Sequence, residues 1–126
     1  YTVMFGLAGL NLRNGMSVVL DAAFSLPRTR TQARKVALAN GASFAAISCL
    51  CSDSDRWRQQ LAADPPLTEG WASPAFVSPE HLQKRYYPWR GPHLSLDMLG
   101  PLDDCYQRLT AYLDGVRAMD MGDADE

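Results

Sequence analysis

The sequence predicts an α/β protein in which helices join the strands of a parallel sheet in a three-layer αβα arrangement. Two short runs rich in branched apolar residues, 17–20 and 43–50, are each followed by a carboxylate, Asp21 or Asp53. About twenty residues of helical pattern separate the two runs, as in a strand–helix–strand unit. A third run, 93–98, alternates apolar and polar residues. Three strands joined by helices therefore predict one layered domain.

The 126 residues suit a single domain, which we place at 1–118, followed by an acidic tail at 119–126 that we expect to be disordered. The formal charge of −2 gives no overall attraction to nucleic acid, although it does not exclude a local basic patch. No apolar run approaches the length of a membrane span, so we expect a cytoplasmic protein without a membrane partner. The start at Tyr1 lacks an initiator methionine and a basic signal region, which predicts that the chain begins inside a longer protein.

The first two helices are predicted from apolar periodicity and from glycine stop signals. The first ends at Asn14 and Gly15, and the second, 28–40, ends at Gly41. The apolar positions of the first helix are Val3, Met4, Leu7 and Leu10. Each helix therefore leads into a predicted strand.

After the second strand, Ser52 or Asp53 is placed to cap a helix at 54–63. The proline-containing stretch 64–78 has no clear period and predicts a lid or an insertion, because compact domains rarely need so long a loop. A short helix should follow at 78–87 and end before Pro88.

The last helix is predicted to open at Pro101 and to run to about Ala118. Its apolar positions at helical spacing are Leu102, Cys105, Leu109, Leu113 and Val116. The three cysteines cannot all pair, and Cys49 and Cys51 are too close along one strand for a disulfide framework. We therefore predict reduced, buried thiols.

The order of four segments along the chain is similar to that of a known protein family. The segments are 13–24, 28–41, 49–57 and 94–97. Together they resemble the C-terminal part of P-loop ATP-binding proteins related to polynucleotide, zeta-toxin-like and small-molecule kinases, a group similar to AAA-type ATPases. The resemblance implies a Walker B strand ending at Asp21, a basic helix, a strand leading into an arginine-bearing lid, and a closing strand and helix.

The phosphate-binding loop of that family, Gly-x-x-x-x-Gly-Lys-Ser/Thr, does not occur in this sequence, since the glycines at 6–9 are too close together and no lysine follows. The resemblance therefore implies an ATP-dependent phosphotransferase or ATPase whose first strand, phosphate loop and second strand are missing here. ATP and Mg²⁺ are the implied cofactors of the complete protein. For this chain alone we expect weak or no nucleotide binding and no activity, and the phosphoacceptor, a small molecule or a nucleic acid, stays open.

The resemblance also assigns roles to individual residues. Asp21 would hold Mg²⁺ through water, in competition with a simple role as a turn former at a strand end. Arginines suit phosphate oxygens because the guanidinium is a fixed fork of donors, and solvated helix charges are the alternative. The candidates are Arg28 for cofactor binding and Arg56 and Arg58 for catalysis.

Other polar and aromatic residues are interpreted structurally. Asp53 is expected to cap a helix rather than to act in catalysis. The two histidines, His81 and His93, have no metal-type partner nearby in the sequence. Four aromatic residues are expected to pack a loop against the core, with stacking on a base or a sugar as the alternative: Trp71, Tyr86, Tyr87 and Trp89.

A second class of function is a non-catalytic α/β interaction module, a degenerate kinase relative that packs against a partner. In the resembling family the strand that carries the phosphate loop lies between the Walker B strand and the next strand. Without it we predict that 17–21 and 43–50 close up into a direct parallel pair. The alternative is a loosely packed chain that depends on a missing N-terminal segment or on self-association, because unpaired strands recruit partners.

Overall fold

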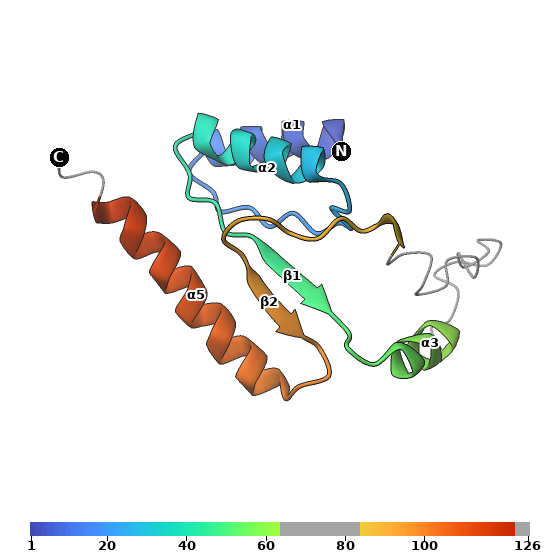
Figure 1. The fold of residues 1–126 in the computed structure, drawn as a ribbon. Helices are drawn as coiled ribbons and strands as arrows, with labels where there is room; N and C mark the ends of the chain where they lie inside the picture. Colours follow the sequence, from blue (N-terminus) through green and yellow to red (C-terminus); the bar gives the residue numbers. More distant parts are fainter. Residues whose placement is uncertain (64–83, 123–126) are drawn as a thin grey trace.

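The computed structural model describes residues 1–63 and 84–122 (Figure 1). The elements are α1 (Thr2–Arg13), α2 (Pro27–Ala39), β1 (Ile47–Leu50), α3 (Ser54–Ala63), β2 (Leu94–Asp97) and α5 (Leu102–Gly122). From α2 onward, helices alternate with two parallel strands, which agrees with the predicted α/β class. The described residues do not show the predicted three strands.

The sheet consists of β1 and β2 paired in parallel, with Ile47 opposite Leu94 and Leu50 opposite Asp97. Helix α5 runs alongside and contacts β2 (Figure 1). Leu96 on β2 and Cys105 on α5 are both buried, and they form the apolar centre of this part of the molecule. The sheet and α5 therefore make one packing unit.

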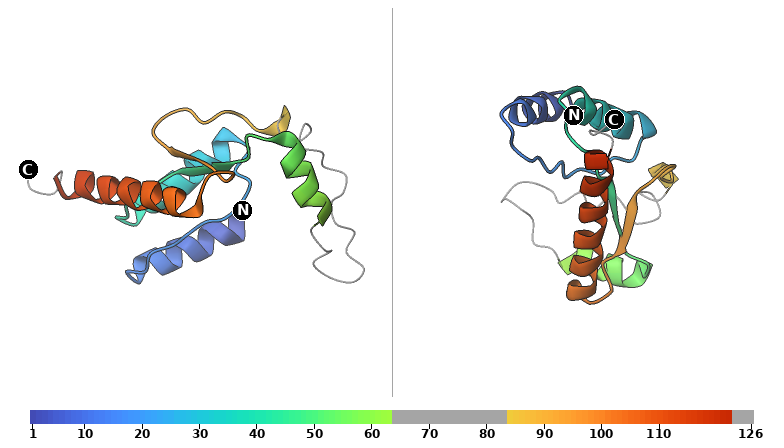
Figure 2. Two further views of the ribbon diagram at one scale, coloured as in Figure 1. Left: turned by 90° about the horizontal axis from the view of Figure 1, so that it is seen from below. Right: turned by 90° about the vertical axis from the view of Figure 1, so that its left-hand side faces the viewer.

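Helices α1 and α2 form a second unit, in which the two helices lie side by side (Figure 2). Their buried residues are mostly small, namely Ala8, Gly9, Ala33 and Ala37. Small residues let two helix backbones approach closely, which explains the pairing. Both helices end at the predicted glycines, Gly15 with φ +75° and Gly41 with φ +66°, where a side chain would be strained.

The predicted first strand, 17–20, is wrong. The segment forms no strand, and the sheet of the described residues has two strands, β1 and β2. A strand exists only where a neighbour completes its backbone hydrogen bonds, and β1 pairs with β2 instead. Val19 is 92% exposed as a result. The predicted direct pair between 17–21 and 43–50 is therefore wrong as well.

The other predicted elements are shifted rather than absent. The strand expected at 43–50 is confirmed only at its end, Ile47–Leu50, and the one expected at 93–98 is Leu94–Asp97. Helix α5 continues to Gly122, about one turn beyond Ala118, into the stretch that we expected to be a disordered tail. The predicted lid at 64–78, with Trp71, and most of the predicted helix at 78–87, with His81, lie outside the described residues.

Candidate functional site

The carboxyl ends of β1 and β2 meet at one edge of the sheet, which is where parallel α/β proteins place their working residues. At this edge Asp97, the last residue of β2, reaches across to the residues that follow β1. Its Oδ1 accepts hydrogen bonds from the backbone N–H of Ser52, at 3.3 Å, and of Leu99, at 3.2 Å. One carboxylate therefore joins the ends of both strands.

Hydrogen bonds from Ser52 and Leu99 lower the pKa of Asp97 below its ordinary value of 3.8. The hydroxyl of Ser52 contributes most, followed by the amide of Leu99, while desolvation acts in the opposite direction and the amide of Ser52 adds a smaller lowering effect. Asp97 is consequently a carboxylate at neutral pH. Asp97 is not among the site residues predicted from the sequence, although it ends a strand in the same way as was predicted for Asp21.

Asp53, on the β1 side of this edge, caps α3 as interpreted from the sequence. Its Oδ1 accepts hydrogen bonds from the backbone N–H of Asp55, at 2.9 Å, and of Arg56, at 3.0 Å. The thiol of Cys51 donates to the carbonyl oxygen of Asp53 at 3.2 Å. One oxygen of the Asp53 carboxylate is thus engaged by the helix.

The other sequence candidates lie on separate elements. Asp21 is exposed in the segment between α1 and α2, and Arg28 is exposed in the first turn of α2. Arg56 and Arg58 are exposed on α3, where Arg58 forms an ion pair with Asp55. Figure 1 and the right-hand view of Figure 2 show α2 and α3 well apart, and the two helices make no contact, so the structure does not bring Arg56 and Arg58 to Arg28. The roles assigned to these residues stay predictions.

A cluster around Arg30 was missed by the sequence analysis. Arg30 is only 6% exposed, and its guanidinium lies 4.8 Å from the ring centroid of Tyr86 and 4.5 Å from that of Trp89. Cations are attracted to aromatic faces at such distances. The buried charge is thus stabilised partly by two rings, and no described carboxylate forms a salt bridge with it.

Backbone carbonyl groups accept all the hydrogen bonds that Arg30 donates among the described residues. Nε donates to the carbonyl of Phe24 at 2.5 Å, and the terminal nitrogens donate to the carbonyls of Ser25, Tyr87 and Pro88 at 3.3, 2.6 and 3.2 Å. The amide of Tyr87 also donates to the carbonyl of Ser25 at 3.0 Å. We call this arrangement the Arg30 cluster: Arg30 with Phe24, Ser25 and residues 86–89.

The Arg30 cluster supports the structural interpretation of the aromatic residues, since Tyr86 and Trp89 pack on a side chain of this protein. A sequence signal for Arg30 did exist. It shares one face of α2 with the buried residues Ala33 and Ala37, and a charged residue on an apolar helix face points to a buried partner.

His93 extends the same cluster along the chain. Its ring stacks on Trp89 with 5.5 Å between centroids, and its two ring nitrogens lie 3.0 Å from the carbonyl of Gly91 and 3.1 Å from the hydroxyl of Ser95. The indole N–H of Trp89 in turn donates to the hydroxyl of Tyr86 at 2.7 Å. Both ring nitrogens of His93 are thus engaged locally, which supports a structural role.

The cysteines are free thiols, but the prediction that all are buried is wrong. Cys105 is buried, Cys51 is half-buried and Cys49 is exposed. Among the described elements β1 contacts β2 and no helix. Within the described residues no group of three or more His, Cys, Asp or Glu side chains is arranged to hold a metal ion. No helix in this part of the chain is long and apolar enough to cross a membrane.

Comparison with known protein families, with curated proteins and with solved structures finds no match to this chain. The evidence for the α/β class is therefore the arrangement of helices and parallel strands in this structure, and the evidence on function is the chemistry of its residues.

Proposed function

We propose that the chain is the C-terminal portion of a P-loop ATP-binding, kinase-like phosphotransferase with a three-layer αβα fold. In the complete protein the strand that carries the phosphate loop would complete the parallel sheet. The supporting observation is that, among the described residues, one edge of β1 has no partner strand. Ala46 and Leu50 direct their carbonyls to β2, accepting from Leu94 and Met98 at 2.9 Å each. Since strand residues alternate in direction, the backbone groups of Ile47 and Cys49 face away from β2.

The composition and burial of β1 fit a central strand. In a parallel sheet covered on both faces, central strands are apolar along their whole length. Ile47 is 38% exposed and Leu50 is 42% exposed, so two large apolar side chains of a short strand remain uncovered. A neighbouring strand and its helix would bury them, and the resemblance to P-loop kinases places the missing strand beside this edge.

In this proposal ATP would provide the transferred phosphoryl group, and Mg²⁺ would neutralise negative charge on the ATP phosphates. Mg²⁺ takes oxygen ligands and is usually held by one or two carboxylates together with phosphates and water. The exposed carboxylate of Asp21 fits that requirement, and no larger protein cage is needed. Arg28 would bind the nucleotide, and Arg56 and Arg58 would contact the transferred phosphate, as guanidinium groups commonly do.

The test uses a chain extended upstream through a glycine-rich lysine loop. We expect this longer protein to hydrolyse or transfer the γ-phosphate of ATP and Asp21→Asn to lower the rate by about 10²-fold or more, because a charge-stabilising group is lost. Asp114→Asn, an equal change of charge on an exposed residue of α5, is the matched control. Equal rates for the wild type and Asp21→Asn would remove the assignment of Asp21.

The alternative, a non-catalytic α/β interaction module, is favoured by a different observation. One face of α1 exposes three apolar side chains at helical spacing, Val3 at 75%, Leu7 at 56% and Leu10 at 52%. Such a face commonly packs against another surface. Calorimetry of the extended chain with Mg²⁺ and ATP separates the two functions, since the phosphotransferase binds the nucleotide and the module does not.

A further inference from the structure

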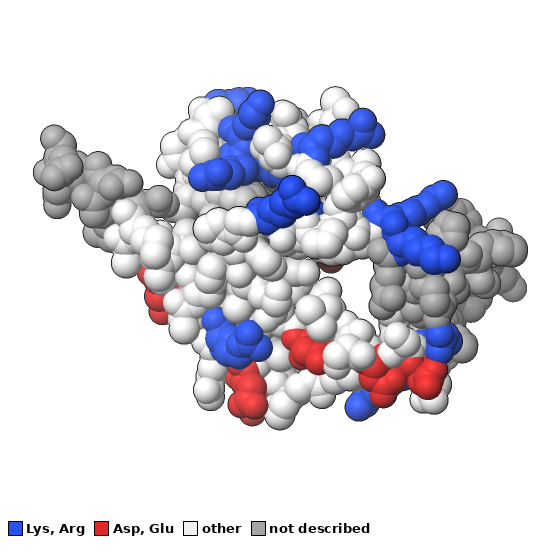
Figure 3. Space-filling model, viewed as in Figure 1, with Lys and Arg blue, Asp and Glu red and all other residues white. Residues whose placement is uncertain are grey.

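Positive charge is concentrated on the helix pair α1–α2. Residues 1–41 contain five basic residues and one acidic residue, whereas the rest of the chain is acidic overall. The five are Arg13, Arg28, Arg30, Arg34 and Lys35. Neither helix contains Asp or Glu. Figure 3 shows blue side chains over these helices and most of the red ones at the opposite end.

This charge is not neutralised within the described part of the chain. Arg30 is turned into its own cluster, and no described carboxylate forms a salt bridge with Arg13, Arg28 or Lys35. The single polar contact of this kind is neutral, from Arg13 to the side-chain oxygen of Asn40 at 3.4 Å. Exposed cations without carboxylate partners attract anions.

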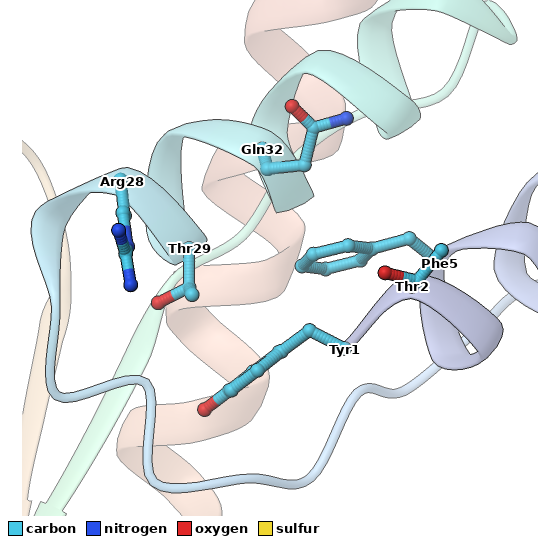
Figure 4. Close-up of a pocket in the computed structure, with 6 residues that line it drawn as sticks. All are labelled: Tyr1, Thr2, Phe5, Arg28, Thr29 and Gln32. Atoms are coloured by element: carbon cyan, nitrogen blue, oxygen red, sulfur yellow. The ribbon is translucent and has the colours of Figure 1, made fainter.

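The groove between the two helices contains two adjoining hollows, of about 480 and 360 Å³. Phe5 of α1 and Gln32 of α2 line both, so the hollows form one elongated groove. In the first hollow the rings of Tyr1 and Phe5 lie opposite Arg28 and Gln32 (Figure 4). Basic residues therefore stand at both ends of the groove, Arg28 at one and Arg13 and Lys35 at the other.

The spacing of the cations suits a chain of phosphates. Arg28 and Lys35 are separated by roughly 10 Å along α2, at about 1.5 Å per residue. That length is long enough to span more than one phosphate of a nucleic acid strand, since even in a duplex each strand advances by only about 3.4 Å per nucleotide. The rings of Tyr1 and Phe5 line the hollow beside Arg28, where they pack on each other at 5.8 Å between centroids and on Phe24. Their remaining exposed surface is of the kind on which bases stack without regard to sequence.

We propose that the α1–α2 groove binds single-stranded nucleic acid without sequence preference. The cations contact the phosphates, the aromatic rings stack with bases, and the amide of Gln32 offers hydrogen bonds between them. An acidic peptide would use the cations but leave the ring faces unused. This inference shares Arg28 with the proposed nucleotide site, but it involves neither Asp21, the phosphate loop nor the edge of β1. Its test uses no ATP, so oligonucleotide binding can fail or succeed whether or not the extended protein turns over ATP.

The experiment measures fluorescence anisotropy of a labelled oligothymidylate of about 12 nucleotides over a range of salt concentrations. The double variant Arg28→Gln, Lys35→Gln should bind at least about 10-fold more weakly at low salt and should lower the salt slope by roughly 0.7 for each lost phosphate contact. The control Arg90→Gln, Arg117→Gln removes the same charge from exposed residues outside the groove. It should retain the wild-type slope.

A third variant, Phe5→Leu, removes the ring but keeps an apolar side chain, and should weaken oligothymidylate binding at all salt concentrations. Circular dichroism establishes that each variant is folded. The proposal is overturned if the wild type does not bind at low salt, or if the groove and control variants lose affinity equally. It is also overturned if polyglutamate or anionic lipid vesicles bind as tightly as the oligonucleotide and Phe5→Leu has no effect on the latter.

Discussion

The helix pair α1–α2 and the unit formed by β1, β2 and α5 differ in how complete they are. The helix pair packs through small residues such as Ala33 and Ala37, each helix ends at its own glycine, and their partners are close in sequence. Within the described residues, the sheet unit buries one large apolar side chain, Leu96, and one edge of β1 has no partner strand. The helix pair therefore finds its packing partners within this chain, whereas one edge of β1 finds no partner strand among the described residues.

The two units are joined mainly through the Arg30 cluster. Among the described elements, direct contacts run within each unit, from α1 to α2, from β1 to β2 and from α5 to β2. Arg30 on α2 reaches the carbonyls of Tyr87 and Pro88, which precede β2. The comparison thus indicates that one guanidinium positions a basic helix pair relative to an acidic sheet unit.

The largest expected effect follows from Arg30→Met, which keeps an unbranched stem but removes the charge and the donors. Arg30 donates to four backbone carbonyls, of which that of Ser25 keeps a second donor, the amide of Tyr87. Hydrogen bonds to charged groups contribute about 1.5 to 3 kcal/mol each to stability, and the desolvation cost that disappears with the buried charge offsets part of that loss. We expect the free energy of unfolding to fall by about 3 kcal/mol, measured by urea unfolding monitored through tryptophan fluorescence.

Arg34→Gln, an exposed substitution on the same helix, is the control and should change stability by less than about 0.5 kcal/mol. Arg30→Lys should recover only part of the loss, because an ammonium group lacks the planar fork of donors. If Arg30→Met unfolds at the same urea concentration as Arg34→Gln, the two units are not joined through Arg30.

The next effect concerns the small core of the sheet unit. Leu96 is 5% exposed, and Leu96→Ala should lower the free energy of unfolding by about 2 to 3 kcal/mol through lost burial and a cavity. Val19→Ala, at a residue that is 92% exposed, is the control and should have almost no effect. Thermal unfolding measures both. Comparable losses for the two variants would mean that Leu96 is not the centre of this unit.

The smallest effect is a dependence on pH at the carboxyl edge of the sheet. Because the pKa of Asp97 is lower in the folded protein than its ordinary value of 3.8, its contribution to stability is present above that value. The contribution is lost as the pH falls through the lower folded pKa. Asp97→Asn should therefore flatten the acid side of the stability profile and leave its shape near neutral pH unchanged. An unaltered acid profile would contradict this assignment.

The sequence predicted the helices well because their ends are local signals. Asn14, Gly15 and Gly41 mark the ends of α1 and α2, and Asp53 caps α3 as expected. The segment 17–20 has the composition of a strand, but composition cannot supply the neighbour that a strand requires. Whether the segment 17–20 pairs depends on the other strands of the sheet, and the local sequence pattern of 17–20 contains no information about them.

The site was predictable only in part, for similar reasons. Asp97 follows the strand-end rule and could have been selected. Arg30 could be suspected from its helix face, but its partners Tyr87 and Pro88 are far along the chain and accept through backbone oxygens, which leave no mark in the sequence. The aromatic residues at 86–89 predicted packing, but nothing in the sequence indicated that Tyr86 and Trp89 pack on the guanidinium of Arg30.

Hydrogen exchange at β1 tests the central claim, that its unpaired edge is the place of a missing strand. In this chain the amides of Ile47 and Cys49 should exchange rapidly, while those of Ser48 and Leu50, which face β2, should be protected. In the chain extended upstream through the phosphate loop, Ile47 and Cys49 should become protected by about 10²-fold or more. Equal protection of these two amides with and without the upstream segment would contradict the proposed completion of the sheet.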